Sequence, residues 1–231
     1  YSTDKKWHIP HFEKMLYDNA QLVSLYADAY AETKNELFKE VVIETLEFVK
    51  NELTSSEGAF YSSLDADSYT KDNELEEGAY YSWTKEELSS ILKEDYKLFS
   101  KYYNVNDYGK WEKNQYVLIK KIDDNTFEKN NNISKTKLKK LKNQWKEKLA
   151  PIKRNRKKPR LDDKSLTSWN GLMLKAYLDA YTVFNNAEYL EIAIKNANFI
   201  ASNQLSDNGK LFHNYKNSKS TVNGYLDDYA K

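Results

Sequence analysis

The pentapeptide "YADAY" at residues 26–30 returns as "YLDAY" at residues 177–181, a shift of 151 positions. The same shift, with no gap, superposes further matching pairs and segments: Glu40 on Glu191, Ile43 on Ile194, Phe48 on Phe199, Asn19 on Asn170, and "SSEGAFY" (55–61) on "SDNGKLF" (206–212). This self-similarity predicts a repeated unit. The unit is a helix, a short turn, a second helix and a glycine-bearing loop that ends in aromatic residues.

Apolar residues in both copies recur every three or four positions, which is the helical period. Helices are therefore predicted over four ranges: 11–33, 36–53, 166–184 and 187–204. "GYLDDYA" (224–230) resembles the opening of a further copy, with Asp228 in the place of Asp18. Repeated hairpins bury their apolar faces against neighbouring hairpins. An open solenoid and a closed α/α toroid both fit this rule, and the length of the repeats with their unequal loops favours the toroid.

The segment between the two copies predicts a mixed insert. "EGAYYSW" (77–83) and "QYVLIKK" (115–121) predict short strands, and "DDNTFEKNNN" (123–132) predicts a polar loop. Thr84 with Glu87 forms a capping box that opens a helix over 84–103, and a further helix is predicted over 134–152. The expected fold is mainly α, a partial (α/α) toroid with one or two short β-hairpin insertions. Its predicted parts are repeat units at about 11–83 and 162–223 and an insert at about 84–161.

Composition limits the classes of function. The chain has 231 residues with 36 basic and 35 acidic side chains, so its charge favours neither nucleic acid nor membrane as a partner. It has no cysteine, which excludes disulfides, thiolate nucleophiles and cysteine metal sites within it. There is no signal peptide, no apolar run long enough to span a membrane and no initiator methionine. We expect a single-domain fragment of a longer, cytoplasmic protein.

A basic run, "KLKKLKNQWKEKLAPIKRNRKKPR" (137–160), is the strongest local charge feature. Lysine and arginine contacts to phosphates dominate nonspecific binding of nucleic acids. However, Leu138, Leu141 and Trp145 make the helical part amphipathic, so a solvated helix face is the preferred interpretation. A funnel for anionic substrates comes next, and nucleic-acid binding last.

Five segments occur in an order and spacing that resemble a known family: "YSTDKKWHIPHFEKMLYDNAQL", "GAFYSSLDADS", "EGAYYSWTKEEL", "DDKSLTSWNGLM" and "GYLDDYA". The family consists of proteins with an N-terminal thioredoxin-like domain and a large α/α toroid, typified by bacterial YyaL and the vertebrate spermatogenesis-associated relatives. The resemblance covers essentially the whole chain. It implies a toroid similar to those of N-acylglucosamine 2-epimerases, mannose isomerases and unsaturated glucuronyl hydrolases. It also implies a thioredoxin-like domain upstream, as a partner within the same protein.

The repeat predicts where the candidate site residues gather. If the first helix of each pair is the inner one, the inner helices run parallel and all begin at one end. Loops that leave the outer helices return to that end. Four acidic or polar loops are then expected there with His11 and Glu13: residues 62–68, 160–171, 211–215 and 225–229.

His11 is the first candidate for a catalytic base or acid. It follows Pro10, and proline is preferred at the first position of a helix. A helix N-terminus favours the neutral imidazole that a general base requires. A histidine that only forms a hydrogen bond at a loop junction is the alternative.

The acidic pairs Asp65 and Asp67, Asp162 and Asp163, and Asp227 and Asp228 supply carboxylates on the same predicted face. Hydrolysis of a glycosidic bond takes two carboxylates roughly 5–9.5 Å apart, and epimerisation of a sugar takes an acid and a base. Asp65, Asp67 and Asp163 are therefore the predicted catalytic partners of His11, with helix capping as the alternative for Asp163 and Asp227. The EF-hand pattern is missing, and neither a metal nor a cofactor is expected.

The remaining candidates are assigned to substrate binding: Glu13, Lys14, Asp18, Trp83, Lys164, Asn170, His213 and Asp228. Glu13 and Asp18 also fit the role of complementing a helix dipole, and Asn170 that of a bridge between helices. The leading hypothesis is a carbohydrate-active domain resembling N-acylglucosamine 2-epimerase or sugar isomerase toroids, which performs acid–base chemistry on a sugar or uronic acid. A glycoside-hydrolase-like reaction belongs to the same class. The alternative is a noncatalytic helical scaffold that presents a client or peptide to the thioredoxin-like domain.

Overall fold

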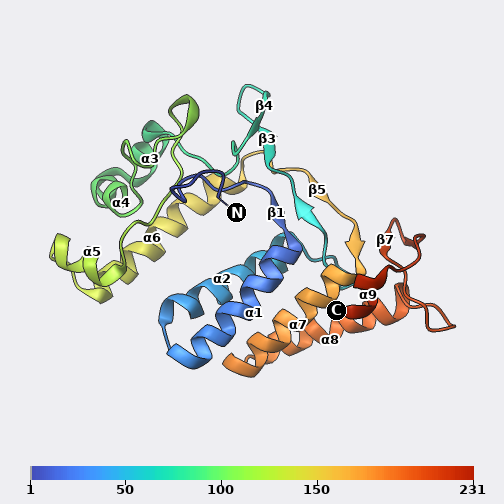
Figure 1. Cartoon of the computed structure of the whole chain (residues 1–231). Helices are drawn as coiled ribbons and strands as arrows, with labels where there is room; N and C mark the ends of the chain where they lie inside the picture. The colour runs from blue at the N-terminus through green and yellow to red at the C-terminus, as the bar shows by residue number, and fades with distance from the viewer. Residues whose placement is uncertain (1) are drawn as a thin grey trace. The chain divides into compact units, whose positions relative to one another are not determined.

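Two helical hairpins repeat each other in the computed structural model, which describes residues 2–231 (Figure 1). The helices are α1 (Leu16–Thr33) with α2 (Glu36–Glu52), and α7 (Thr167–Phe184) with α8 (Ala187–Asn203). Every bound of the second hairpin lies 151 positions after that of the first. The caps follow the same rule, because Asn35 accepts the Leu37 N–H at 3.0 Å and Asn186 accepts the Glu188 N–H at 3.1 Å.

The chain divides into two units, each with its own core. The hairpin unit comprises Glu13–Asp65 and Leu161–Lys231. The insert unit comprises Tyr1–Phe12 and Ala66–Arg160.

In the hairpin unit, the inner helices α1 and α7 lie side by side and run parallel. Tyr17 near the start of α1 meets Trp169 near the start of α7, with ring centroids 4.8 Å apart. Tyr30 meets Phe184 near the other ends, at 5.2 Å. Buried alanines on both helices permit this close approach: Ala20, Ala27, Ala176 and Ala180. The outer helices are joined to this layer in part through Tyr177, whose hydroxyl donates to the Leu46 carbonyl at 3.1 Å.

Short antiparallel strands close the end at which the inner helices begin. One sheet has the order β1-β2-β5, with β1 (Lys14–Met15), β2 (Ser63–Leu64) and β5 (Leu161–Asp162). The other has the order β6-β7-β8, with β6 (Ser165–Leu166), β7 (Asn214–Lys216) and β8 (Lys219–Ser220). Strands β1 and β6 lead directly into α1 and α7, and α9 (Leu226–Ala230) follows at the same end because its Asp228 accepts a hydrogen bond from the Ser168 N–H.

The insert unit contains a β-hairpin and a separate group of helices. The hairpin pairs β3 (Asp67–Tyr69) with β4 (Leu75–Glu77). The helices are α3 (Lys85–Leu92), α4 (Tyr96–Tyr102), α5 (Asp124–Asn131) and α6 (Lys135–Arg154), with 3₁₀ turns at Lys93–Asp95 and Glu112–Asn114. Their core is aromatic, with Phe99 and Trp145 edge to face at 5.3 Å. The predicted capping box is confirmed, since Thr84 accepts the Glu87 N–H and Glu87 accepts the Thr84 N–H.

Five local predictions are wrong. The segment 77–83 forms no continuous strand, because β4 ends at Glu77 and a turn follows at 78–81. The predicted helix over 84–103 is divided into α3 and α4 by the 3₁₀ turn at Lys93–Asp95. The first helix begins at Leu16 and not at residue 11, because Lys14 and Met15 pair with β2 and Met15 has extended backbone angles. The predicted loop at 123–132 contains α5, because Asp123 caps the Thr126 N–H at 2.9 Å and Phe127 supplies a buried anchor. Residues 115–121 form no strand and contribute only isolated bridges at Tyr116.

The predicted fold class is confirmed: mainly α, a partial (α/α) toroid of helical hairpins with short β-hairpins. Within residues 2–231, none of the helices combines the length and the apolar character that crossing a bilayer would require.

Candidate functional site

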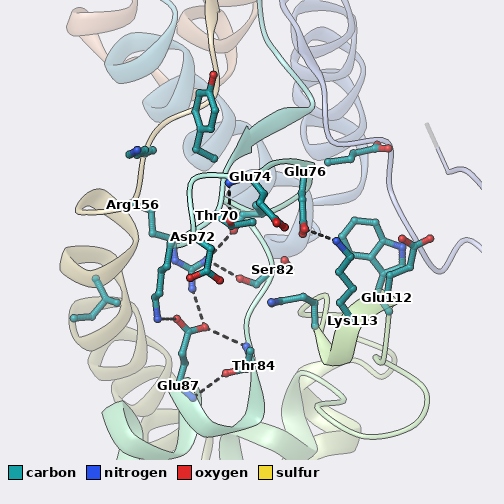
Figure 2. Close-up of a pocket in the computed structure, with 18 of the residues that line it drawn as sticks. Thr70, Asp72, Glu74, Glu76, Ser82, Thr84, Glu87, Glu112, Lys113 and Arg156 are labelled. Carbon is teal, nitrogen blue, oxygen red and sulfur yellow. Dashed lines mark hydrogen bonds and ion pairs between the residues drawn. The ribbon is translucent and has the colours of Figure 1, made fainter.

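The β3–β4 hairpin of the insert unit borders a groove of about 970 Å³. Hydrogen-bonding side chains line most of it, and three larger apolar or aromatic side chains contribute to its walls: Tyr69, Trp111 and Ile152. Figure 2 shows charged side chains from the hairpin, from α3 and from the segment after α6 directed toward a common space. The volume falls within the range of small-molecule sites.

The groove carries more acidic than basic side chains. Its carboxylates are Asp72, Glu74, Glu76, Glu77, Glu87 and Glu112, and its cations are Lys71, Lys113, Arg156 and Lys157. The cations largely have partners: Lys71 lies 2.8 Å from Glu87, Lys113 pairs with Glu76, and Lys157 donates to Asn73 at 2.5 Å. The groove therefore presents oxygen acceptors more than positive charge to a ligand.

Arg156 organises the wall of the groove. One guanidinium nitrogen donates to three carbonyl oxygens, those of Ala79 (3.3 Å), Tyr80 (3.1 Å) and Ser82 (2.6 Å). The other donates to Glu87 at 3.2 Å, as Figure 2 shows. Burial alone would raise the pKa of Glu87, but hydrogen bonds from Lys71 and the Thr84 N–H and the charge of Arg156 outweigh it, so that this pKa is lowered.

His11 belongs to the insert unit and lies beside a carboxylate of the groove. Its Nδ1 is 3.4 Å from Oε1 of Glu77, which lines the groove. Asp67 is the direct partner of Glu77 in the β3–β4 ladder. Directly opposite residues of an antiparallel pair have side chains on the same face, about 4.5–5.5 Å apart at Cβ. Glu77 is thus a neighbour of both predicted residues, His11 through its side chain and Asp67 through the strand register.

Glu77 was not among the predicted site residues, although it stands at the start of "EGAYYSW". A hairpin register read from "LDADSYTKDNELEEG" would have placed it opposite Asp67. His11 itself does not lie at a helix N-terminus, because α1 begins five residues later. The argument from the helix dipole therefore does not apply to His11 or Glu13.

Trp83 lies in the core of the insert unit. Its side chain is 3% exposed, and its backbone pairs with Tyr116 in both directions. The Arg156 guanidinium covers its ring at 4.0 Å, in cation–π geometry. Both contacts hold Trp83 inside the insert unit, and the prediction that it contacts substrate stays a prediction.

The other predicted residues belong to the hairpin unit: Asp65, Asp163, Glu13, Lys14, Asp18, Lys164, Asn170, His213 and Asp228. Ion pairs occupy the acidic loop, because Lys164 lies 3.2 Å from Asp162 and Lys216 lies 2.5 Å from Asp163. Lys14 lies in β1, Asp65 directly follows β2, and Asp18 lies in the first turn of α1. Asp163 does not cap α7, whose N-cap residue is Leu166.

Asn170 is a structural bridge. Its side chain is fully buried, and it accepts from the Phe60 N–H and from Asn196 Nδ2 while it donates to the carbonyls of Phe60 and Leu166. These four bonds use the full hydrogen-bonding capacity of an amide side chain. These bonds fit the predicted alternative of a bridge between structural elements, while the assignment of Asn170 to substrate binding stays a prediction.

His213 and Asp228 form a direct pair, 2.9 Å apart from Nδ1 to Oδ2. The Asp228 side chain is 0% exposed, and it also accepts the Ser168 N–H at 3.0 Å and the Tyr225 N–H at 2.8 Å. The His213 side chain is 27% exposed. A second, small cavity of about 140 Å³ lies in the same unit and is lined in part by Asp163, Ser165 and Tyr215.

The search of known proteins finds no family model that matches, but it finds relatives along the whole chain. An uncharacterised protein of Caenorhabditis elegans is 33% identical over 258 aligned positions, which cover 100% of this chain and 35% of that protein. Spermatogenesis-associated protein 20 of Homo sapiens is 32% identical over 259 positions, covering 100% of this chain and 33% of that protein. The chain thus spans about one third of the length of these relatives, and the predicted family resemblance is confirmed.

Solved structures with some similarity include D-mannose isomerase, with a TM-score of 0.29 and 15% identity over 90% of this chain and 46% of the other. They also include cellobiose 2-epimerase from Spirochaeta thermophila, with a TM-score of 0.26 and 14% identity over 92% of this chain and 65% of the other. Both TM-scores lie below 0.5, so these similarities say nothing about the chemistry of this chain.

Proposed function

We propose that this chain, a homologue of about one third of spermatogenesis-associated protein 20, contributes to a carbohydrate-active domain. The groove of the insert unit is the proposed sugar-binding site. His11 is the proposed proton-transfer residue, with Glu77 and Asp67 as its carboxylate partners.

The observation that carries this proposal is the His11–Glu77 pair at the wall of a groove rich in hydrogen-bonding groups. Sugars offer many hydroxyl groups and two apolar ring faces. Carboxylate and amide oxygens in the groove can accept the hydroxyls, while Tyr69 and Trp111 can cover a ring face. Only a few of these side chains need to contact any one sugar.

The arrangement suits acid–base chemistry. Epimerisation beside a carbonyl takes one proton from carbon and returns one to it, so it requires a base and an acid within reach. An imidazole and a neighbouring carboxylate can share these roles. Asp67 and Glu77, on one face of the hairpin, supply the residue type that glycoside hydrolysis uses in pairs.

The test is a ligand screen by thermal shift on the full-length protein, with monosaccharides, uronic acids, N-acyl sugars and sugar phosphates. A ligand at about a hundred times its Kd stabilises by roughly 2.7 kcal/mol, which raises Tm by a few degrees. We expect a hit that Glu77→Gln and His11→Gln weaken. Glu86→Gln is the control, because it removes an exposed carboxylate of the same unit that does not line the groove.

A hit that survives both Glu77→Gln and His11→Gln would contradict the assignment of the groove. No hit across the panel, with well-folded protein, would favour the alternative function of a noncatalytic scaffold. In that case the thioredoxin-like domain of the whole protein becomes the proposed partner, and a client or peptide becomes the proposed ligand.

A further inference from the structure

The pair of His213 and Asp228 is built as an oriented base. The Asp228 carboxylate is removed from solvent and receives three donors, the backbone N–H groups of Ser168 and Tyr225 and Nδ1 of His213. A carboxylate is an acceptor only, so Nδ1 of His213 must carry the proton in this pair. When the ring is neutral, Nε2 is then the nitrogen with the lone pair.

The backbone of His213 is fixed as firmly as its ring. Its N–H donates to the Val222 carbonyl at 2.7 Å, and its carbonyl accepts from the Thr167 N–H at 2.9 Å. The ring lies 4.7 Å from the ring of Tyr225, between centroids. Among the described residues, Nε2 has no hydrogen-bond partner, while the His213 side chain remains partly exposed.

The internal repeat supplies a control for the role of this pair. Ser62 occupies the place of His213 in the first copy, and its carbonyl accepts the Leu16 N–H just as that of His213 accepts the Thr167 N–H. The strand registers agree as well, with Met15 opposite Ser63 and Leu166 opposite Asn214. In the first copy a serine makes this backbone contact to the start of the inner helix, so the contact does not require a histidine.

Asp228 also differs from the residue at the corresponding position of the preceding inner helix. It is the third residue of α9, and it reaches back to the second residue of α7, Ser168. The third residue of α7 is Trp169, which reaches back to the second residue of α1, Tyr17, by ring contact. Apolar packing can thus join successive inner helices, and the buried carboxylate is an additional feature of the second junction.

We propose that the hairpin unit carries an acid–base centre of its own, in which His213 Nε2 accepts a proton from a hydroxyl-bearing ligand and Asp228 is the positioning residue. The arrangement of a buried carboxylate, Nδ1–H and an available Nε2 is the one that general bases use, because the carboxylate selects the tautomer and stabilises the imidazolium that forms. The groove of the insert unit is not required for this centre, so the carbohydrate screen does not decide it.

The test is the tautomer of His213, measured by long-range ¹H–¹⁵N correlation spectra of the histidine rings at pH 8 and assigned with His213→Gln. We expect a protonated Nδ1 and an unprotonated Nε2. In Asp228→Asn, the amide oxygen is expected to keep the Ser168 N–H, which puts the amide NH₂ in the place of Oδ2, where it faces both the ring and the Tyr225 N–H. The imidazole should then lose the Nδ1–H tautomer.

A reactivity measurement completes the test. Diethyl pyrocarbonate acylates unprotonated imidazole nitrogens, and labelling of each histidine can be followed by mass spectrometry. We expect labelling of His213 that falls in Asp228→Asn. His8, whose Nε2 contacts the Tyr108 carbonyl, is the internal control that should not change.

An Nε2–H tautomer in the unmodified protein would overturn the proposal. So would an Asp228→Asn protein in which His213 keeps both its tautomer and its extent of labelling. If Asp228→Asn does not fold, His213→Asn replaces it, because the Asn amide can donate to Asp228 in place of Nδ1–H. A folded His213→Asn protein supports a role beyond structure. An unfolded one shows that the ring itself is structural and overturns the proposal.

Discussion

Asn170 holds both backbone hydrogen-bonding groups of Phe60, with its Oδ1 2.8 Å from the Phe60 nitrogen and its Nδ2 3.0 Å from the Phe60 oxygen. Phe60 ends the glycine-bearing loop of the first repeat, and Asn170 lies in the first turns of α7 in the second. Both residues are fully buried. One side chain thus completes the backbone pairing of a loop that is 110 residues away in sequence.

Replacement of Asn170 by Ala is therefore expected to reduce the free energy of unfolding by about 3 kcal/mol, because it leaves buried N–H and carbonyl groups without partners. Urea denaturation followed by circular dichroism measures this change. Asn19→Ala is the matched control. Asn19 is the repeat counterpart, but it lies half-buried and donates to the carbonyl of Met15, the N-cap residue of its own helix. We expect a loss of less than about 1 kcal/mol there, and equal losses at the two positions would contradict the bridging role.

The two repeat glycines provide a second comparison. Gly58 has φ +98° and Gly209 has φ +79°, so a side chain is strained at both. A Cβ at Gly58 would also lie 2.7 Å from Lys195 Cγ and 3.1 Å from the Lys195 carbonyl oxygen, whereas nothing lies within 4 Å of one at Gly209. Gly58→Ala is expected to destabilise by about 1–2 kcal/mol more than Gly209→Ala, by overpacking. Thermal unfolding of both variants measures the difference, and a larger loss at Gly209 would contradict it.

Arg156 is expected to be essential for the insert unit, because its side chain is 13% exposed and serves three carbonyls, Glu87 and the face of Trp83. A lysine cannot reproduce both the fork of donors and the planar stacking. Arg156→Lys should therefore destabilise by about 2–3 kcal/mol. Near-ultraviolet circular dichroism of the aromatic core follows the transition.

The control for Arg156 is Lys157→Met. Lys157 is the exposed neighbour, which donates to Asn73 and lies over the ring of Tyr69. Its loss should change stability by no more than about 0.5 kcal/mol. If Arg156→Lys also changes stability by no more than about 0.5 kcal/mol, the cluster of carbonyl groups does not depend on the guanidinium.

Acid is expected to weaken the insert unit through Asp124, the first residue of α5. Burial alone would raise its pKa, but hydrogen bonds from Lys120, Tyr102 and Lys142 lower it from 3.8 to about 2. Because the folded pKa is depressed, this stabilisation is present above the unfolded pKa of about 4 and is lost as the pH falls toward 2. Asp124→Asn should flatten the dependence of Tm on pH between 4 and 2, relative to the unmodified protein. An unchanged slope would contradict the assignment.

The sequence predicted the helical hairpins closely, and local chemistry explains why. Helical periodicity, asparagine caps and turn glycines act over a few residues, so they can be read from a linear pattern. The 151-residue shift then carries every bound of α1 and α2 onto α7 and α8. The sequence placed the start of the first helix at residue 11 and not at Leu16, because Lys14 and Met15 pair with Ser63 and Leu64, about fifty residues away.

The surroundings of the candidate site residues depended far more on contacts between segments that are distant in the sequence. The sequence by itself determined the repeat, the hairpins, the capping box at Thr84 and the residue types available for acid–base chemistry. Only the tertiary structure decided that Arg156 covers Trp83, that Asn170 serves Phe60, that Glu77 joins His11 to Asp67, and that Asp228 orients His213. Burial and hydrogen-bond partners arise when segments far apart in the chain meet, and periodicity and residue spacing do not encode those meetings.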